Sequence, residues 1–517
     1  MVDTRNSDLM EMGYYWKLVR DFVRGEKVIK DNGELYLPRK AGETDSDYKG
    51  YLARAKPGDY TSQLLNNLHG MIMRRPPVIE YPDSPLIRKI LKNFDGEGHT
   101  VYQSTSDTVM DNMQTSFGGI LVDMPSAIEG ISEYDAENME LLPFAKYYPA
   151  ETIVSRKYIK TRTGKKLAQV VLEERIDKLK NEFEVENIVQ YRVISLDENG
   201  DCYVRIFGAT NEASPMADGK AEYIQKTEPV YITVRGSHIN FIPFVFCPGT
   251  GTNHHLEKPM LYGVAELHKH YYMQSADYEN GVHFTTVPTL WITGHDDTNT
   301  KDDGGNKLVL GGDTALVLPE AEAKIGTVQF SGEGLSHAEK AKSETLEQIG
   351  ILGSRTVAPD KAMSETSDAA RIHRVGENSR LATYAKNMSE CYTKVLEIMA
   401  DWIGVQGNVS VQFNVDYDTT AFDPNALNAI ANLSREGKFP LPLVFEALKK
   451  GEYLPNEFTL QDYMVLLEVE LSGASISDIL QVYQKIRSGE SFEIKPASVP
   501  TDRSKNTPAS DIKHELV

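Results

Sequence analysis

The sequence predicts an α+β protein with several lobes, and three observations lead to this prediction. The chain has 517 residues, which is too long for one ordinary hydrophobic core. Apolar residues recur at helical spacing over residues 1–125 and again after residue 262. Residues 140–246 instead alternate polar and apolar side chains, as strands do. Helical and strand-rich stretches therefore follow one another along the chain.

The first 125 residues are predicted to be mainly helical. One helix follows from the apolar spacing in GYYWKLVRDFVRG and ends at Gly25, and a second covers YTSQLLNNLHGMIMRR and ends before Pro76 and Pro77. PLIRKILKNF is a short third helix. TVYQSTSDTVMDNMQTSFGG then leads through Gly118 and Gly119 into the strand ILVDMP.

Residues 140–246 are predicted to form an antiparallel β layer on these helices. KLAQVVLEERI and NIVQYRVISLDENGDCYVRIFG alternate polar and apolar residues, and Asn199-Gly200 is a strong hairpin signal between two such runs. Thr163-Gly164 closes a second hairpin within SRKYIKTRTGKKLAQVV.

That second hairpin is basic. We interpret it as a solvated hairpin, and a contact with nucleic acid or with an acidic neighbouring subunit is the alternative. Its basic residues are Lys157, Lys160, Arg162, Lys165 and Lys166.

A polar linker at residues 247–259 is followed by a predicted helix over residues 262–284. The insert at 287–330 is again strand-like, with TLWITG, then KLVLGGDTALVL as a hairpin about Gly311 and Gly312, then KIGTVQF. A small β insert thus separates two helices.

The second of these helices is predicted to begin at a capping box formed by Ser336 and Glu339. The stretch GILGSRTVAPDKAMSETSDAARIHR, residues 350–374, then interrupts the helical pattern with small, polar and Pro residues. Helical periodicity resumes as far as Trp402, and a helix of that length spans about 50 Å. Gly376 is a position at which such a helix could bend.

The C-terminal part is predicted to be helical after a closing strand, NVSVQFNVDYD. Four helical segments follow, and the tail from about residue 490 lacks apolar periodicity and is predicted to be disordered. The segments are DPNALNAIANLSREG, LPLVFEALKKG, TLQDYMVLLEVEL and SISDILQVYQKIRSG.

Composition limits the function classes. The formal net charge is −20, whereas stable binding to phosphates normally requires a basic face. No apolar run is long enough for a membrane helix, and the N-terminus does not resemble a secretory signal. We therefore expect synthesis in the cytoplasm and no membrane partner. Cys202, Cys247 and Cys391 show no CxxC spacing, so we expect buried thiols and neither a disulfide framework nor a zinc site.

No motif for an enzyme or a cofactor is found. Each GK dipeptide lacks the rest of a phosphate-binding P-loop, and no GxSxG is present. His268 and His270 lie two residues apart on a predicted helix, which favours surface residues over metal ligands. Two polar clusters could coordinate a cation, although exposed loop polarity explains both equally well. They are His254, His255 and Glu257, and His295, Asp296 and Asp297.

The order helix, β insert, helix, polar loop and very long helix after an α/β lobe resembles the portal protein of tailed bacteriophages, over about residues 10 to 470. Segments similar to one portal family are YLARAKPGDYTSQLLNNLHGMIMRRPPVI, GGILVDMP, YYMQSADYENGVHFTTVPTLWITG and ETSDAARIHRVGENSRLATYA. The resemblance rests on segment similarity and order, because portals have no catalytic signature.

The resemblance implies a homo-oligomeric ring, typically of twelve subunits, at one vertex of the virion capsid. Double-stranded DNA passes through its channel during packaging and ejection, and the expected partners are terminase, head-tail adaptor proteins, the major capsid protein and scaffold. The implied parts are a wing at 1–258, stem helices at 259–286 and 335–352, a clip at 287–334, a tunnel loop at 353–366, a long wing helix with closing strand at 367–422, a helical crown at 423–488 and a disordered tail at 489–517.

Site residues follow from this placement. Cations of the tunnel loop and its vicinity are expected to face DNA, and clip residues are expected to dock terminase or an adaptor. The channel residues are Arg355, Lys361, Arg371 and Arg374, and the clip residues are His295, Asp296, Asp297 and Lys301.

Two alternatives belong to other classes. One is a phage DNA-handling nuclease that uses acidic clusters with Mg²⁺, although no recognisable acidic constellation supports it. The other is a different structural virion protein, such as a minor capsid or tail component.

Overall fold

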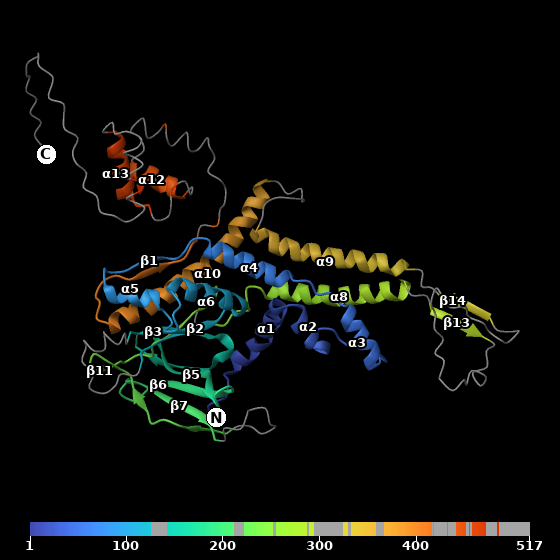
Figure 1. The fold of residues 1–517 in the computed structure, drawn as a ribbon, viewed down its shortest axis with the longest axis horizontal. Helices are drawn as coiled ribbons and strands as arrows, with labels where there is room; N and C mark the ends of the chain where they lie inside the picture. Colours follow the sequence, from blue (N-terminus) through green and yellow to red (C-terminus); the bar gives the residue numbers. More distant parts are fainter. Residues whose placement is uncertain are drawn as a thin grey trace, which may run out of the picture. The chain divides into compact units, whose positions relative to one another are not determined.

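The computed structural model describes a mixed helical and β protein in two compact units, Met1–Tyr417 and Asp418–Val517 (Figure 1). The described residues are 1–125, 142–162, 164–210, 222–251, 255–286, 289–293, 324–328, 332–357, 367–415, 417, 432, 441–450, 454, 458–471 and 483–484.

The helices of the first unit lie in two groups along the chain, one at the N-terminus and one after residue 261. They are α1 (Ser7–Arg24), α2 (Glu26–Asp31), η1 (Gly33–Leu35), α3 (Asp45–Arg54), α4 (Tyr60–Met73), α5 (Pro85–Lys92), α6 (Val101–Thr115), η2 (Ala150–Thr152), α8 (Tyr262–Thr286), α9 (Glu333–Val357) and α10 (Ser367–Trp402).

Most strands lie between the two helical groups and form antiparallel sheets. One sheet has the order β4-β5-β6-β7-β8, with β9 also on β7, and another has the order β12-β2-β3, while β1–β15, β10–β11 and β13–β14 are pairs. The strands are β1 (Val78–Glu80), β2 (Gly118–Asp123), β3 (Phe144–Pro149), β4 (Ile153–Thr161), β5 (Gly164–Leu179), β6 (Val185–Leu196), β7 (Cys202–Ala209), β8 (Tyr223–Gln225), β9 (Val230–Tyr231), β10 (Thr233–Val234), β11 (Ser237–His238), β12 (Phe244–Phe246), β13 (Thr289–Thr293), β14 (Lys324–Val328) and β15 (Ser410–Gln412).

The predicted N-terminal elements are confirmed. Helix α1 ends at Gly25, whose φ of 87° is the left-handed conformation that glycine adopts without strain. Helix α6 begins at a capping box formed by Thr100 and Gln103, and the chain then enters β2 at Gly118. Both predicted hairpins also form, as β4–β5 and β6–β7.

The core joins segments far apart in sequence, because the C-terminal half of α10 is buried against α6. The hydroxyl of Tyr392 donates to Thr108 Oγ1 at 2.8 Å, and the indole of Trp16 in α1 donates to the carbonyl of Thr115 at the end of α6 at 3.0 Å. All three aromatic side chains at this centre, Trp16, Tyr384 and Tyr392, are fully buried.

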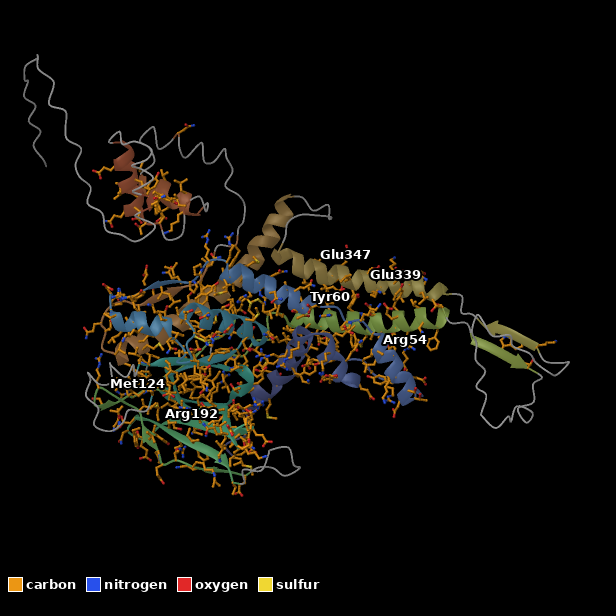
Figure 2. The ribbon with its side chains drawn as sticks, viewed as in Figure 1. Arg54, Tyr60, Met124, Arg192, Glu339 and Glu347 are labelled. Atoms are coloured by element: carbon orange, nitrogen blue, oxygen red, sulfur yellow. A yellow bond between two sulfur atoms is a disulfide. The ribbon has the colours of Figure 1, made fainter. Side chains whose placement is uncertain are left out.

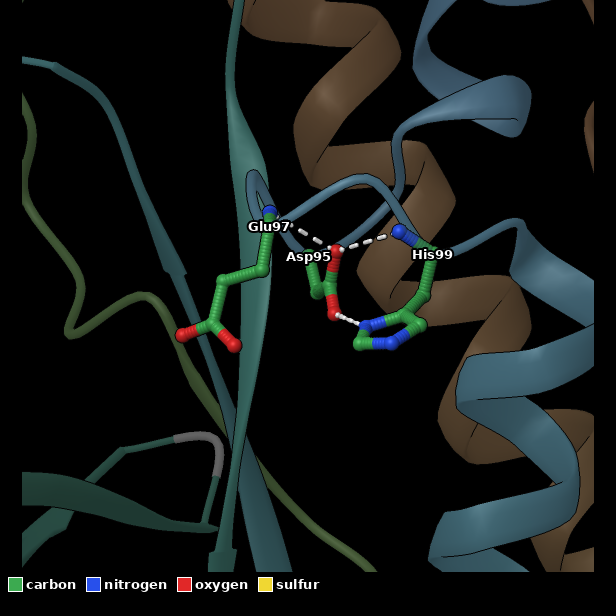
Figure 3. Close-up of side chains that lie close together, drawn as sticks. All are labelled: Asp95, Glu97 and His99. Atoms are coloured by element: carbon green, nitrogen blue, oxygen red, sulfur yellow. Dashed lines mark hydrogen bonds and ion pairs between the residues drawn. The ribbon is translucent and has the colours of Figure 1, made fainter.

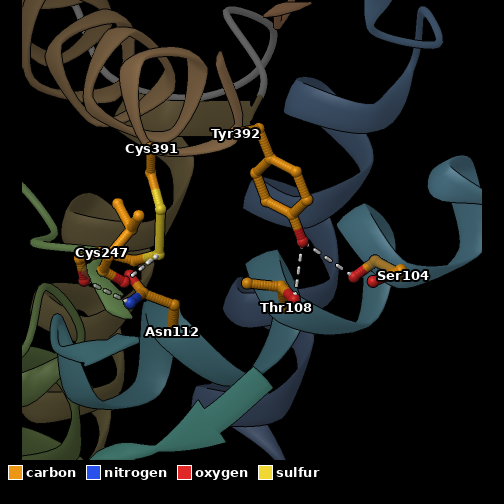
Figure 4. The surroundings of a disulfide bond; sticks show 7 residues. Ser104, Thr108, Asn112, Cys247, Cys391 and Tyr392 are labelled. Carbon is orange, nitrogen blue, oxygen red and sulfur yellow. Dashed lines mark hydrogen bonds between the residues drawn. A yellow bond between two sulfur atoms is a disulfide. The ribbon is translucent and has the colours of Figure 1, made fainter. Parts of the chain in front are cut away.

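A disulfide joins Cys247, just after β12, to Cys391 in α10 (Figure 4). Beside it, the Asn112 side chain donates to the carbonyl of Cys247 at 2.8 Å. The expectation that all three cysteines are buried is confirmed, but the expectation that they are unpaired is wrong for these two. The 144-residue separation hid their proximity. Burial raises the pKa of Cys202 to about 12, which keeps this thiol protonated.

The prediction that His268 and His270 are both surface residues holds for His270, which is exposed, and is wrong for His268, which is fully buried. Its Nε2 donates to the carbonyl of Pro57 at 2.9 Å, so Nδ1 accepts from the hydroxyl of Thr61 at 2.8 Å. The rings of Phe22 and Tyr60 pack edge-on against it. The side chain is thus a structural link between α8 and the N-terminal helices.

Helix α9 starts at Glu333, three residues before the predicted capping box, and ends at Val357, inside the predicted 353–366 loop. Of that loop, residues 358–366 lie outside the described part of the chain, as do the inner clip hairpin about Gly311 and the segment DPNALNAIANLSREG.

The second unit contains α12 (Leu441–Lys450) and α13 (Leu460–Leu471), which match two predicted helical segments and pack on one another. Phe445 of α12 lies 5.5 Å from Tyr463 of α13, measured between ring centroids.

The buried His268 makes stability depend on pH. Burial lowers its pKa from 6.5 to about 4. Between these values the unfolded chain binds the proton and the folded chain does not, so stability falls as pH drops through this window. In denaturant titrations, the free energy of unfolding of the wild type should fall by about 2 kcal/mol between about pH 7 and pH 5 because of His268. His268→Gln should remove that component, and an equal loss in this variant would contradict the assignment. His270→Gln is the matched control.

Candidate functional site: the paired helices and the long helix after them

Helices α8 and α9 pack side by side in antiparallel directions (Figure 1). Gly281 of α8 lies against Leu335 near the start of α9, since a Cβ at Gly281 would lie 2.7 Å from Leu335 Cδ2. Two turns further along α9, Lys342 Nζ lies 3.9 Å from the centre of the Tyr278 ring, which precedes Gly281 in α8. A cation over an aromatic face contributes about 0.5–1 kcal/mol at such partly exposed sites.

The strand pair β13–β14 connects these two helices. Thr289 pairs with Val328 and Thr293 with Lys324, and the ring of Trp291 lies over Gly326, where a Cβ would meet it at 2.4 Å. Glycine is therefore required opposite this tryptophan. The strand that leaves α8 and the strand that enters α9 are thus held together at their base.

The opposite side of α8 is bound to the segment around α3. The hydroxyl of Tyr51 donates to Asp277 Oδ1 at 2.8 Å, and Arg54 donates to Asn280 Oδ1 at 2.9 Å. Lys40 lies 2.9 Å from the same Asp277 carboxylate. Burial and the Asp277 charge together raise the pKa of Tyr51, so its hydroxyl stays a donor. These contacts, over 200 residues apart in sequence, fix the direction of α8.

Helix α9 presents a wide polar face to solvent. Only Thr345 and Ile349 are buried in its described part, whereas Glu339, Glu344 and Glu347 are exposed. Figure 2 labels Glu339 and Glu347 along this helix. Lys340 is the exposed cation among them and lies 3.9 Å from Glu344. The exposed face of α9 is therefore acidic.

Helix α10 is 36 residues long, as the sequence predicted. Its described C-terminal half carries a buried stripe at helical spacing. The stripe comprises Leu381, Tyr384, Ala385, Met388, Cys391, Tyr392, Val395, Leu396 and Met399.

Three of the four predicted channel cations fall in helices. Arg355 belongs to the last turn of α9 and not to a loop, which corrects the prediction, because α9 continues to Val357. Arg371 and Arg374 fall in the first turns of α10. The side chains of these three arginines, and the whole of Lys361, lie outside the described residues.

The clip residues cannot be placed, since His295, Asp296, Asp297 and Lys301 are all outside the described residues. In the other polar cluster, His254 also lies outside, His255 is exposed, and Glu257 accepts a hydrogen bond from Thr250 at 2.8 Å.

Asp95, Glu97 and His99 form the group of possible metal ligands found among the described residues (Figure 3). Asp95 already accepts hydrogen bonds from the backbone N–H groups of Glu97 and His99, and its second oxygen lies 2.5 Å from His99 Nδ1. The Asp95 hydrogen bond and charge raise the pKa of His99. Because both oxygens of Asp95 are already engaged within the loop, the group is best explained as a set of contacts that closes this loop before α6. The sequence analysis did not single it out.

A cavity of about 600 Å³ lies between α2, the end of α3 and the end of α8. Its polar lining residues include Glu26, Lys30, Arg54, Lys56 and Glu279. Lys30 pairs with Glu26 and Lys56 with Glu279, so these four charges are compensated, while Arg54 donates to the neutral side chain of Asn280.

Residues 260–403 match a family model described as a domain of unknown function (DUF4055). The match spans α8, β13, β14, α9 and α10, which is less than half of the chain. No curated protein matches the sequence. No helix in the described ranges is long and apolar enough to span a bilayer.

Several solved structures are distantly similar. A chain in the neck of a native GTA particle, computed with C12 symmetry, has 9% identity and a TM-score of 0.33 over 78% of this chain and 88% of the other. A chain in the neck of an empty GTA particle, computed with C6 symmetry, has 10% identity and a TM-score of 0.35 over 74% and 86%. A chain in the virion of the native gene transfer agent particle has 11% identity and a TM-score of 0.32 over 80% and 94%. Scores of this size do not establish a common fold.

The start of α9 allows a local test. Gly332, which precedes α9, has a φ of 72°, and its carbonyl accepts from the N–H of Leu335 at 2.9 Å. Gly332→Ala should weaken the first turn of α9 by roughly 1 kcal/mol, because a Cβ strains this conformation. Amide hydrogen exchange near Leu335 should accelerate accordingly. Gly334→Ala, a control inside the helix, should slow this exchange instead. Equal effects of the two variants on exchange would contradict the role of Gly332 in starting α9.

Proposed function

We propose that this chain is the subunit of a phage portal, a ring at one capsid vertex through which double-stranded DNA is packaged, retained and ejected. The observation that carries the proposal is the path from α8 through β13 and β14 to α9 and α10. Two long helices pack antiparallel, a strand pair joins them, and a 36-residue helix returns into the core. This is the order of stem, clip, stem, tunnel loop and long helix in the portal proteins that the sequence resembles.

The charge of the exposed face of α9 supports a channel through which DNA slides more than a surface that binds DNA. A basic wall would hold every phosphate that it met, whereas an acidic wall repels DNA and lets it slide. The exposed face of α9 carries Glu339, Glu344 and Glu347, and the chain as a whole has a formal charge of −20. In this role the chain catalyses no reaction.

The remaining assignments belong to the same proposal. Twelve subunits would form the ring, and the clip residues around β13 and β14 would dock terminase during packaging and head-tail adaptors afterwards. Residues 423–488 would be the crown next to the capsid interior. The functional state would be part of the virion.

Electron microscopy of the purified full-length chain tests the proposal directly. Negative-stain class averages should show closed rings with a central hole, and averages viewed down the ring axis should show about twelve subunits. Filaments, sheets or persistent monomers at every protein concentration would contradict it. Mg²⁺-dependent cleavage of plasmid DNA by the same preparation would favour a nuclease instead.

The loop cations provide a second test. Arg355→Ala with Lys361→Ala should leave ring assembly intact and change DNA packaging or retention, because both residues flank the proposed constriction. Packaged DNA per particle is the measurement. Lys386→Ala with Lys394→Ala, which removes two exposed cations of α10, is the matched control. Unchanged packaging and retention in the loop variant would remove these residues from the proposed channel.

A further inference from the structure

Strand β5 ends in two exposed hairpins of unlike chemistry, one basic and one acidic and apolar. We propose that these two ends bind each other between neighbouring copies of the chain, head to tail. The inference rests on the proposed function, because it supplies a contact that closes the ring. Since β5 has 16 residues, its ends lie roughly 50 Å apart and do not meet within one copy.

The basic end is the β4–β5 turn. Lys160 and Lys165 occupy directly opposite positions across the two strands, and like charges so placed are destabilising. Four of the five basic residues of this hairpin are exposed and Lys166 is half-buried, while Ile159 beside them is 48% exposed. The neighbouring β6–β7 turn contains Asp197, Glu198 and Asp201, so three acidic residues stand against the five basic residues of the β4–β5 hairpin. An excess of positive charge therefore remains at this end.

The opposite end is the tip of the β5–β6 hairpin, which extends beyond its sheet. Strand β4 pairs with β5 only as far as Leu172, and β7 pairs with β6 only from Gln190. Beyond these residues the described chain shows a two-stranded ribbon with no third strand on it. Such a ribbon is marginally stable in water unless something packs on it.

The tip of this ribbon exposes large apolar side chains. Phe183 is 88% exposed and Leu179 is 75% exposed, and Leu179 lies opposite Val185, which is 54% exposed. The turn itself is well defined, because Asn181 Oδ1 accepts from the N–H groups of Phe183 and Glu184, both at 2.9 Å. Phe183 is therefore held outward by a defined turn.

The charges of the tip complement those of the basic end. From Asp177 to Glu186 the ribbon has four acidic residues against two lysines. One of these lysines, Lys180, lies 3.6 Å from Glu184. The acidic residues are Asp177, Glu182, Glu184 and Glu186.

A second copy is the partner that fits these observations. The two surfaces are different, so pairing them generates a heterologous contact, and heterologous contacts that close produce rings. The apolar residues of the tip would be covered together with Ile159, and the carboxylates would separate the opposed lysines of the neighbouring copy. Nucleic acid would satisfy the basic end alone and would leave the apolar tip exposed.

Assembly of full-length variants tests this contact, by sedimentation velocity and native mass spectrometry. Two variants should each raise the protein concentration for half-maximal assembly tenfold or more. One is Phe183→Asp at the tip, and the other combines Lys160→Glu with Lys165→Glu at the basic end. Adding Asp177→Lys and Glu182→Lys to the Lys160→Glu, Lys165→Glu variant should restore assembly to within about threefold of wild type. The charges of both ends are then reversed, so the two ends are complementary again. Lys49→Glu with Lys92→Glu, two exposed lysines on α3 and α5, is the matched control and should assemble normally.

Mixing the two single-end variants distinguishes a head-to-tail contact from a symmetric one. Each variant retains one intact end, so the mixture should form dimers through the single competent contact but no rings. Circular dichroism should show all variants folded, since the changed side chains are exposed.

Three results would overturn the contact. They are unchanged rings in both variants, no recovery on charge exchange, and loss of DNA binding without loss of assembly in the lysine variant. Each leaves the portal proposal standing if the wild type forms rings. Absence of rings in the wild type would instead remove the portal proposal.

Discussion

The burial of α10 is the constraint on which the first unit depends. Tyr384 and Tyr392 are fully buried beside α6, and the disulfide to Cys247 joins the same helix to the end of β12. A helix of 36 residues is about 54 Å long, so it exceeds the stretch that this core can cover. Its N-terminal turns therefore extend beyond the core stripe toward α9, which it also contacts.

Partly buried ion pairs link the strands to this helical core. Arg20 of α1 bonds both Asp111 of α6 and Glu151 of η2, and these partners outweigh its burial and raise its pKa. Arg192 of β6, labelled in Figure 2, likewise bridges Asp123 of β2 and Glu174 of β5. Such pairs add little net stability because desolvation offsets their attraction, but losing one partner leaves a buried charge. They therefore act mainly by lowering the free energy of one arrangement of helices and sheets relative to alternative arrangements.

The sequence predicted the elements better than the contacts between them. Periodicity located α1, α4, α8 and α10 and the two predicted hairpins, because their apolar faces are regular. It placed the start of α9 too late, because Ser336 and Glu339 satisfy a capping pattern while Gly332 permits an earlier turn. The burial of His268 and the pairing of Cys247 with Cys391 depend on partners more than 140 residues away, and no local pattern encodes them. The channel and clip residues stay predictions, since their side chains lie outside the described residues.

In the proposed portal, the chain would have to meet two electrostatic requirements. The surface facing DNA would have to avoid holding it, and the acidic face of α9 would meet that requirement. Subunits that all carry −20 charges also repel one another, so a ring of them needs local complementarity strong enough to overcome the net charge. Screening limits long-range repulsion to about 8 Å at physiological salt, whereas contacting groups act within that distance. In the proposed ring, cations would therefore be most useful where subunits meet, and this argument favours a neighbouring subunit over DNA as the partner of the lysines in the β4–β5 turn.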